Sequence, residues 1–119
     1  MSYWGYHLML DCSGCDISSI ASRDVIYEFV KDLVARIDME AHGEPVIEHL
    51  LSGDPKQGYS LMQLITTSNI CAHFMELDGT AYFDIFSCKT FDIETAKQVV
   101  QEYFRPEKMR VNYITRHAD

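Results

Sequence analysis

Hydrophobic residues recur along the chain with two different periods, which predict strands alternating with helices. Residues 3–11 are rich in apolar and aromatic types and end in the turn signal Cys-Ser-Gly-Cys-Asp, so we expect a strand there. Over residues 23–39 apolar side chains recur every three or four positions, the spacing of an amphipathic helix. Residues 91–104 have the same spacing, and Asp92 is their expected N-cap.

Further segments have the apolar content or alternation of strands and are bounded by turn residues. We expect these strands at residues 43–51, 58–65, 69–77, 80–88 and 108–115. Asp78-Gly79, between two of them, supplies the positive φ of a tight hairpin turn. The pattern predicts an α+β fold, a two-layer α/β sandwich in which two main helices cover one face of a mostly antiparallel sheet.

Length and charge limit the classes of function. The 119 residues suit a single domain over 1–119. Lys and Arg total 10 against 18 for Asp and Glu, and the net charge of −8 repels phosphate backbones, so we expect no nucleic-acid partner. No apolar run is long enough to cross a membrane and no leader resembles a signal peptide, so we expect a cytoplasmic protein with no membrane partner.

The cysteines predict thiols and no metal site. Four cysteines in a cytoplasmic chain are expected to stay reduced. Cys12 and Cys15 form a Cys-x-x-Cys motif, but no second pair of ligands has the spacing that structural zinc requires. We expect both to be small buried or turn residues.

Three chemically active side chains, those of Ser68, His73 and Cys88, belong to one predicted hairpin. Folding at Asp78-Gly79 leaves Cys88 opposite the Ser68 end, so we expect the three side chains to converge. A hydroxyl, an imidazole and a thiol in proximity suit nucleophilic or acid–base chemistry. The alternative is a core cysteine with two ordinary hydrogen-bonded polar side chains.

Several motifs with fixed spacing run through most of the chain. They are GYHLMLDCSGCD at 5–16, GYS at 58–60, TSNICAH at 67–73, Gly79, and DIFSC at 84–88. Together they resemble the short bacterial and archaeal form of S-adenosylmethionine decarboxylase, the pyruvoyl enzyme of polyamine and spermidine synthesis. The joint spacing of these motifs is more specific than any one of them.

The resemblance implies a self-cleaving proenzyme with named roles. The Ser68 hydroxyl would attack the carbonyl of Thr67, the chain would be cut between them, and Ser68 would become a pyruvoyl cofactor. His73 would move the protons of processing, Ser60 would add a supporting hydroxyl, and Cys88 would reprotonate the substrate carbon. The pyruvoyl ketone would form a Schiff base with the substrate amine and accept the electrons left by CO2. The family usually forms homodimers whose interface helps form the sites.

Two positions depart from the family pattern. Thr67 precedes Ser68 where the family has Glu, so we expect slow cleavage. Leu77 stands where an acidic residue binds the substrate ribose, which leaves Glu76 as the candidate substrate-binding carboxylate and predicts weak adenosyl recognition. Two alternatives therefore stay open: a pyruvoyl decarboxylase acting on another amino acid, and an unprocessed homologue that binds a ligand or partner.

Overall fold

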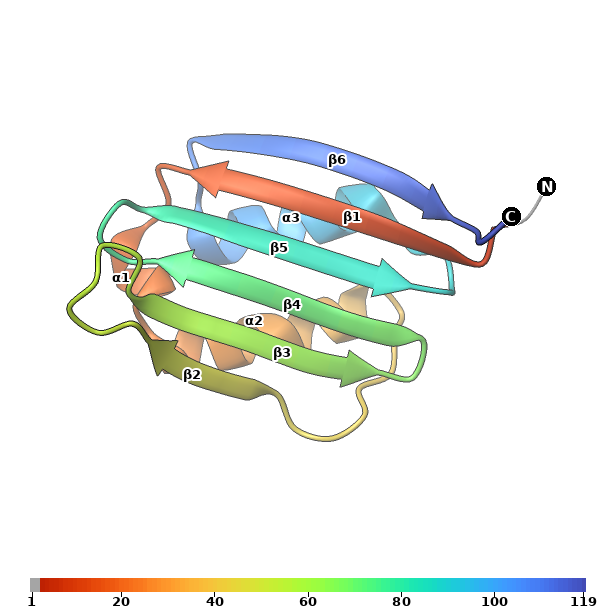
Figure 1. The fold of residues 1–119 in the computed structure, drawn as a ribbon, viewed down its shortest axis with the longest axis horizontal. Coiled ribbons are helices and arrows are strands. Elements are labelled where there is room, and N and C mark those ends of the chain that lie inside the picture. The colour runs from red at the N-terminus through yellow and green to blue at the C-terminus, as the bar shows by residue number, and fades with distance from the viewer. Residues whose placement is uncertain (1–2) are drawn as a thin grey trace.

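The computed structural model describes residues 3–119, whose strands all join one antiparallel sheet in the order β2-β3-β4-β5-β1-β6 (Figure 1). The strands are β1 (Gly5–Ser13), β2 (Val46–Leu50), β3 (Gly58–Ile65), β4 (Ser68–Met75), β5 (Thr80–Ser87) and β6 (Lys108–Arg116). The helices are α1 (Ile17–Ile20), α2 (Arg23–Arg36) and α3 (Ile93–Phe104), and they lie on the same face of the sheet (Figure 1). The predicted α+β sandwich is confirmed.

Side-chain caps set the starts of the helices. The Asp92 carboxylate accepts hydrogen bonds from the backbone N–H groups of residues 94 and 95, as expected for α3. Helix α2 ends at Arg36, earlier than the predicted residue 39, because Asp38 adopts the left-handed conformation with φ of 59°. Helix α1 was not predicted, since its four residues are too short for a visible period.

The hydrophobic core lies between the helices and one face of the sheet. Its centre is a group of fully buried aromatic rings from both layers, with centroids 4.8–5.7 Å apart: Phe29, Phe74, Phe83 and Phe104. Truncating one such ring to alanine typically costs about 3–5 kcal/mol. Because successive strand residues point to opposite faces, the same strands also present a second row of side chains away from the helices.

No described helix covers that second row, which we call the open face of the sheet (Figure 1). It carries polar and titratable groups together with several large apolar side chains that are 41–55% exposed. These apolar residues are Val46, Leu50, Met62, Leu64, Tyr82 and Ile114, with Trp4 at the edge. The candidate site residues Ser60, Ser68, His73, Glu76 and Cys88 lie on this face or at its two ends.

Candidate active site

The predicted cleavage point lies in the turn between β3 and β4. Thr66 and Thr67 form a two-residue turn, since Ile65 and Ser68 pair across the hairpin. Ser68 has a φ of 153°, a region that is otherwise almost restricted to glycine and costs about 1–3 kcal/mol for other residues. The backbone is therefore strained at the residue expected to attack its own peptide bond.

The carbonyl of Thr67 is held by a backbone amide. The Cys88 N–H donates a hydrogen bond to the Thr67 carbonyl oxygen at 2.9 Å, just beyond the end of β5. Ser68 also pairs in register with Ser87, so Cys88 follows directly beside the predicted scissile bond. A donor N–H at this distance suits an oxygen that gains negative charge when its carbonyl carbon is attacked.

Ser60 and His73 form a second polar pair on the open face. They are cross-strand partners on β3 and β4, and the Ser60 hydroxyl oxygen lies 3.1 Å from His73 Nδ1. This pair is not near Ser68, because His73 is five positions further along β4. At roughly 3.3 Å per residue that is about 16 Å. The expected convergence of Ser68, His73 and Cys88 is therefore wrong within one chain: only the Cys88 backbone lies beside the Thr67–Ser68 bond.

Glu76 lies at the opposite end of β4 from Ser68. Its carboxylate accepts a hydrogen bond from the Gln57 amide at 2.7 Å and lies 2.9 Å from His49 Nε2. These contacts, above all the one from His49, lower the pKa of Glu76. The structure does not bring Glu76 to Ser68 of the same chain, and its role in substrate binding stays a prediction.

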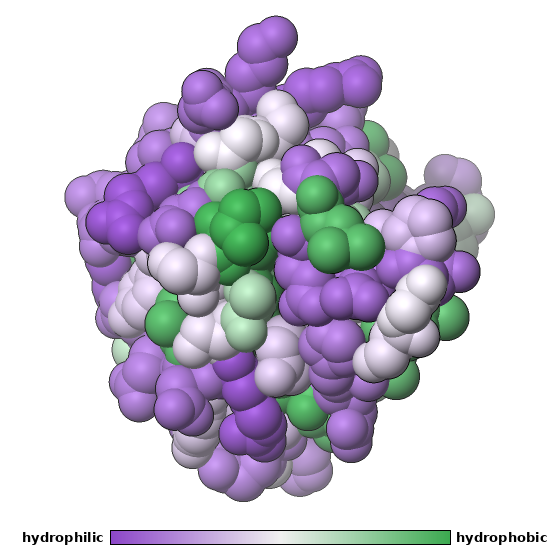
Figure 2. Space-filling view, turned by 90° about the vertical axis from the view of Figure 1, so that its left-hand side faces the viewer, coloured by the Kyte–Doolittle hydropathy of each residue, from purple (hydrophilic) through white to green (hydrophobic). Residues whose placement is uncertain are grey.

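Figure 2 looks at this end of the sheet and shows a mainly hydrophilic surface interrupted by a small group of hydrophobic residues. The β2–β3 loop, the β4–β5 turn and α1 lie here, at the left of Figure 1. Their exposed apolar side chains are Ile17, Leu51 and Leu77. Leu77 is 64% exposed, so the position expected to be acidic presents an apolar side chain to the surface.

Sequence reasoning missed an imidazole–carboxylate pair on the open face. His7 Nε2 lies 3.0 Å from Asp84 Oδ1, joining β1 to β5. Cys71 is the cross-strand partner of Asp84, and burial together with the Asp84 charge raises the pKa of its thiol. Both His7 and Asp84 belong to the motifs quoted above, but their contact requires the β1–β5 pairing, which the sequence pattern does not specify.

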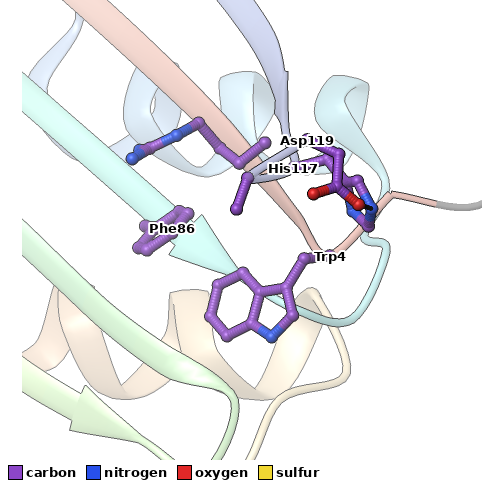
Figure 3. Close-up of a pocket in the computed structure, with 6 residues that line it drawn as sticks. Trp4, Phe86, His117 and Asp119 are labelled. Carbon is purple, nitrogen blue, oxygen red and sulfur yellow. Dashed lines mark ion pairs between the residues drawn. The ribbon is translucent and has the colours of Figure 1, made fainter.

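An aromatic pocket opens at the Ser68 end of the sheet (Figure 3). Phe86 is the cross-strand partner of Asn69, the residue after Ser68. The Trp4 and Phe86 ring centroids are 5.6 Å apart, and the Arg116 guanidinium lies 5.0 Å from the Phe86 ring. The pocket has a volume of about 560 Å³, which is in the range of small-molecule sites.

Other classes of site find no support in the described residues. Among residues 3–119, no group of three His, Cys, Asp or Glu side chains could hold a metal ion. No helix in this range is long and apolar enough to cross a membrane. All four cysteines are free, and burial raises the pKa of Cys12 to about 12 and that of Cys15 to about 11. Both thiols are buried, as the sequence analysis expected.

The fold and the hairpin turn define the class of protein: a two-layer α+β sandwich with a strained serine at the turn between two strands. The family model described as S-adenosylmethionine decarboxylase matches residues 6–117, so the chain belongs to the S-adenosylmethionine decarboxylase family. The resemblance inferred from the motifs is confirmed.

Individual relatives match almost the whole chain. The S-adenosylmethionine decarboxylase proenzyme of Clostridium botulinum is 28% identical over 98% of this chain and 97% of its own length. The proenzyme of Thermomicrobium roseum is 27% identical over 98% of this chain and 96% of its own. The crystal structure of the adenosylmethionine decarboxylase from Aquifex aeolicus VF5 shares the fold, with a TM-score of 0.83 at 18% identity, over 100% of this chain and 95% of that one.

Proposed function

We propose that the chain is the proenzyme of a pyruvoyl-dependent S-adenosylmethionine decarboxylase of polyamine and spermidine biosynthesis, cut by itself between Thr67 and Ser68 in the cytoplasm. The family match supports the decarboxylase class. The observation that carries the cleavage is the strained φ of Ser68 beside a Thr67 carbonyl that already accepts the Cys88 N–H. Strain of this kind persists where the surrounding structure enforces it, often at functional sites.

Cleavage follows from these atoms. The Ser68 oxygen bonds to the Thr67 carbonyl carbon, the carbon–nitrogen bond breaks, and the amide becomes an ester with a free amine on residue 68. The Cys88 N–H stabilises the negative charge that passes through the Thr67 oxygen. β-Elimination then releases the Thr67 carboxylate, and hydrolysis of the remaining enamine releases ammonia and leaves the pyruvoyl group on residue 68.

The surroundings of Ser68 fit such a group. Once the bond is cut, residue 68 becomes the N-terminal residue of β4, beside Cys88 and close to the aromatic pocket. A pyruvoyl group there would supply a ketone for the substrate amine and an electron sink for the carbanion left when CO2 departs. The exposed Cys88 thiol would be the acid that reprotonates the substrate carbon, and Trp4 with Phe86 would offer ring surfaces for the adenine.

We also propose that the protein acts as a homodimer joined through the open face. His73 lies about 16 Å along β4 from Ser68 of the same chain, with Ser60 beside it on β3, too far for a proton transfer that needs hydrogen-bond contact. Packing the open faces of two copies would cover the exposed apolar row and could bring His73 of the partner subunit to Ser68.

A second candidate is a pyruvoyl decarboxylase acting on another amino acid. The exposed Leu77 favours it, because this side chain cannot accept hydrogen bonds from ribose hydroxyls. The two candidates share the cleavage chemistry and differ in substrate. Calorimetry with S-adenosylmethionine and with basic amino acids separates them, since only the true substrate class binds at micromolar concentration. A third reading, the unprocessed homologue, predicts no cleavage at all.

Intact-mass spectrometry of the purified chain tests the cleavage. We expect fragments of residues 1–67 and 68–119, the second beginning with a pyruvoyl group, and we expect Ser68→Ala to stay whole. Thr115→Ala, which removes an exposed hydroxyl from β6, is the matched control and should be cut normally. A wild-type chain that stays whole through days of incubation would eliminate both decarboxylase candidates.

Mixed dimers test the sharing of residues between subunits. Ser68→Ala and His73→Ala should each fail to be cut when expressed alone. In co-expressed mixtures, the His73→Ala chain still has Ser68 and would receive His73 of the partner subunit, so we expect it to be cut. If the mixture stays as intact as the two separate variants, the shared site is wrong.

A further inference from the structure

The side chain of Thr67 is fixed by a chain of hydrogen bonds that the cleavage chemistry above does not use. The Ser87 hydroxyl donates to Thr67 Oγ1 at 2.8 Å, and the Thr67 hydroxyl donates to the Met39 sulfur at 3.3 Å. The Lys89 N–H donates to Ser87 Oγ at 2.9 Å. Ser87 is completely buried, so water does not compete for its hydroxyl.

The same two neighbouring residues therefore hold Thr67 at two points. Ser87 binds its side chain, and Cys88 binds its carbonyl oxygen through the backbone N–H at 2.9 Å. Both contacts hold Thr67 against the end of β5, so a shift of the whole residue away from Cys88 would break the buried contact with Ser87 as well. The position of the Thr67 carbonyl is thus coupled to a hydroxyl pair on the helix-covered side of the sheet.

We propose that Ser87 is a positioning residue for self-cleavage, acting through the Thr67 side chain to keep the carbonyl oxygen on the Cys88 amide while Ser68 attacks. This inference rests on the proposed cleavage. The Ser87 hydroxyl bonds to Thr67 Oγ1, which is not a reacting atom, and this hydroxyl is neither made nor consumed in the reaction. Its effect is to hold the 2.9 Å contact through the step in which the Thr67 oxygen carries negative charge.

The sequence analysis expected slow cleavage because Thr67 stands where the family has Glu. The proposal gives Thr67 the opposite effect: in this chain, threonine favours cleavage. Thr67 is half-buried against the Met39 sulfur and the Ser87 hydroxyl, and it fits this space as a short neutral donor and acceptor. A longer charged side chain would lose both contacts and place a carboxylate beside a thioether. Thr67→Glu, which restores the family's residue, should slow cleavage in this chain.

The test follows precursor and fragments over time after cell-free synthesis of the full chain. Ser87→Ala and Thr67→Val should each slow cleavage about tenfold, the effect of losing one orienting hydrogen bond. Ser87→Thr, which keeps the hydroxyl, should cleave close to the wild-type rate. The double variant Ser87→Ala with Thr67→Val should be no slower than the slower single variant, because both changes break the same contact.

Added hydroxylamine identifies the step that is slowed, since it cleaves the ester but not the amide. We expect ester formation to be the slow step in Ser87→Ala. Added hydroxylamine should therefore restore little of the cleavage rate that this variant loses. Cleavage of Ser87→Ala at the wild-type rate overturns the positioning role and leaves the proposed function intact. Additive slowing in the double variant would also overturn the positioning role, because it would indicate general destabilisation rather than loss of one shared contact. A wild-type chain that is never cut overturns the proposed function as well.

Discussion

Strands β3 and β4 begin with the same unusual backbone conformation but with different residues. Gly58 opens β3 with a φ of 157°, and Ser68 opens β4 with a φ of 153°. Residue 58 is a glycine, which adopts this conformation freely because it has no Cβ. A Cβ there would overlap the carbonyl oxygen of Phe74. At Ser68 a side chain is present despite the strain. The chain uses glycine where only the turn matters and keeps a hydroxyl where we propose chemistry.

The largest expected effect on stability comes from replacing Gly58. Gly58→Ala should lower the free energy of unfolding by about 3 kcal/mol or more, because the new Cβ meets rigid backbone of β4 and the φ is unfavourable. Urea unfolding measures the loss. Gly53→Ala is the matched control: it also has a positive φ, of 88°, but nothing lies within 4 Å of its Cβ position. An equal loss in both variants would show that contact with Phe74 is unimportant.

The serine side of the comparison is tested with two variants that both lack the hydroxyl and stay uncut. Ser68→Gly should be more stable than Ser68→Ala by about 1 kcal/mol, since glycine relieves the strain at φ 153° but loses some conformational entropy on folding. At Ser60, which occupies an interior position of β3, the same pair of substitutions should favour alanine. If alanine is also the better residue at position 68, the backbone there is not strained in solution.

The architecture could be predicted from the sequence because helices and strands space their apolar residues at different intervals, and these intervals are visible along the chain. The helix spacing, the Asp92 cap and the Asp78-Gly79 turn all led to elements that the structure contains. The end of α2 was placed too late, since nothing in the spacing marks the left-handed Asp38. The four-residue α1 has no period to detect.

The candidate site was only partly accessible from sequence. The motifs pointed to Ser68, His73, Cys88 and Ser60. Strand pairing places Ser60 beside His73 and the Cys88 amide beside the Thr67–Ser68 bond. The five positions of β4 that separate His73 from Ser68 keep these two sites apart. Motif spacing alone does not show this distance, because it does not say that the segment is an extended strand. The Ser87–Thr67 contact and the His7–Asp84 pair join residues distant in sequence, so only the folded chain shows them.

The smallest expected effect concerns Glu76, at the end of β4 opposite the predicted cleavage point. The contacts from His49 and Gln57 lower the pKa of Glu76, so ionised Glu76 stabilises the folded state. This contribution is fully present above the unfolded pKa of about 4.3 and is lost as the pH falls through the lower folded pKa. Glu76→Gln should therefore cost up to about 1 kcal/mol at pH 7.

The same substitution should also change how stability depends on pH. Below roughly pH 4.3 the wild type loses the Glu76 contribution, whereas Glu76→Gln has none to lose, so the two unfolding free energies should approach each other as the pH falls toward 3. Urea unfolding at a series of pH values measures both curves. Glu48→Gln, at an exposed position on the edge strand β2, controls for the loss of one negative charge. Curves for wild type and Glu76→Gln that stay parallel down to pH 3 would mean that the His49 and Gln57 contacts do not stabilise the ionised carboxylate.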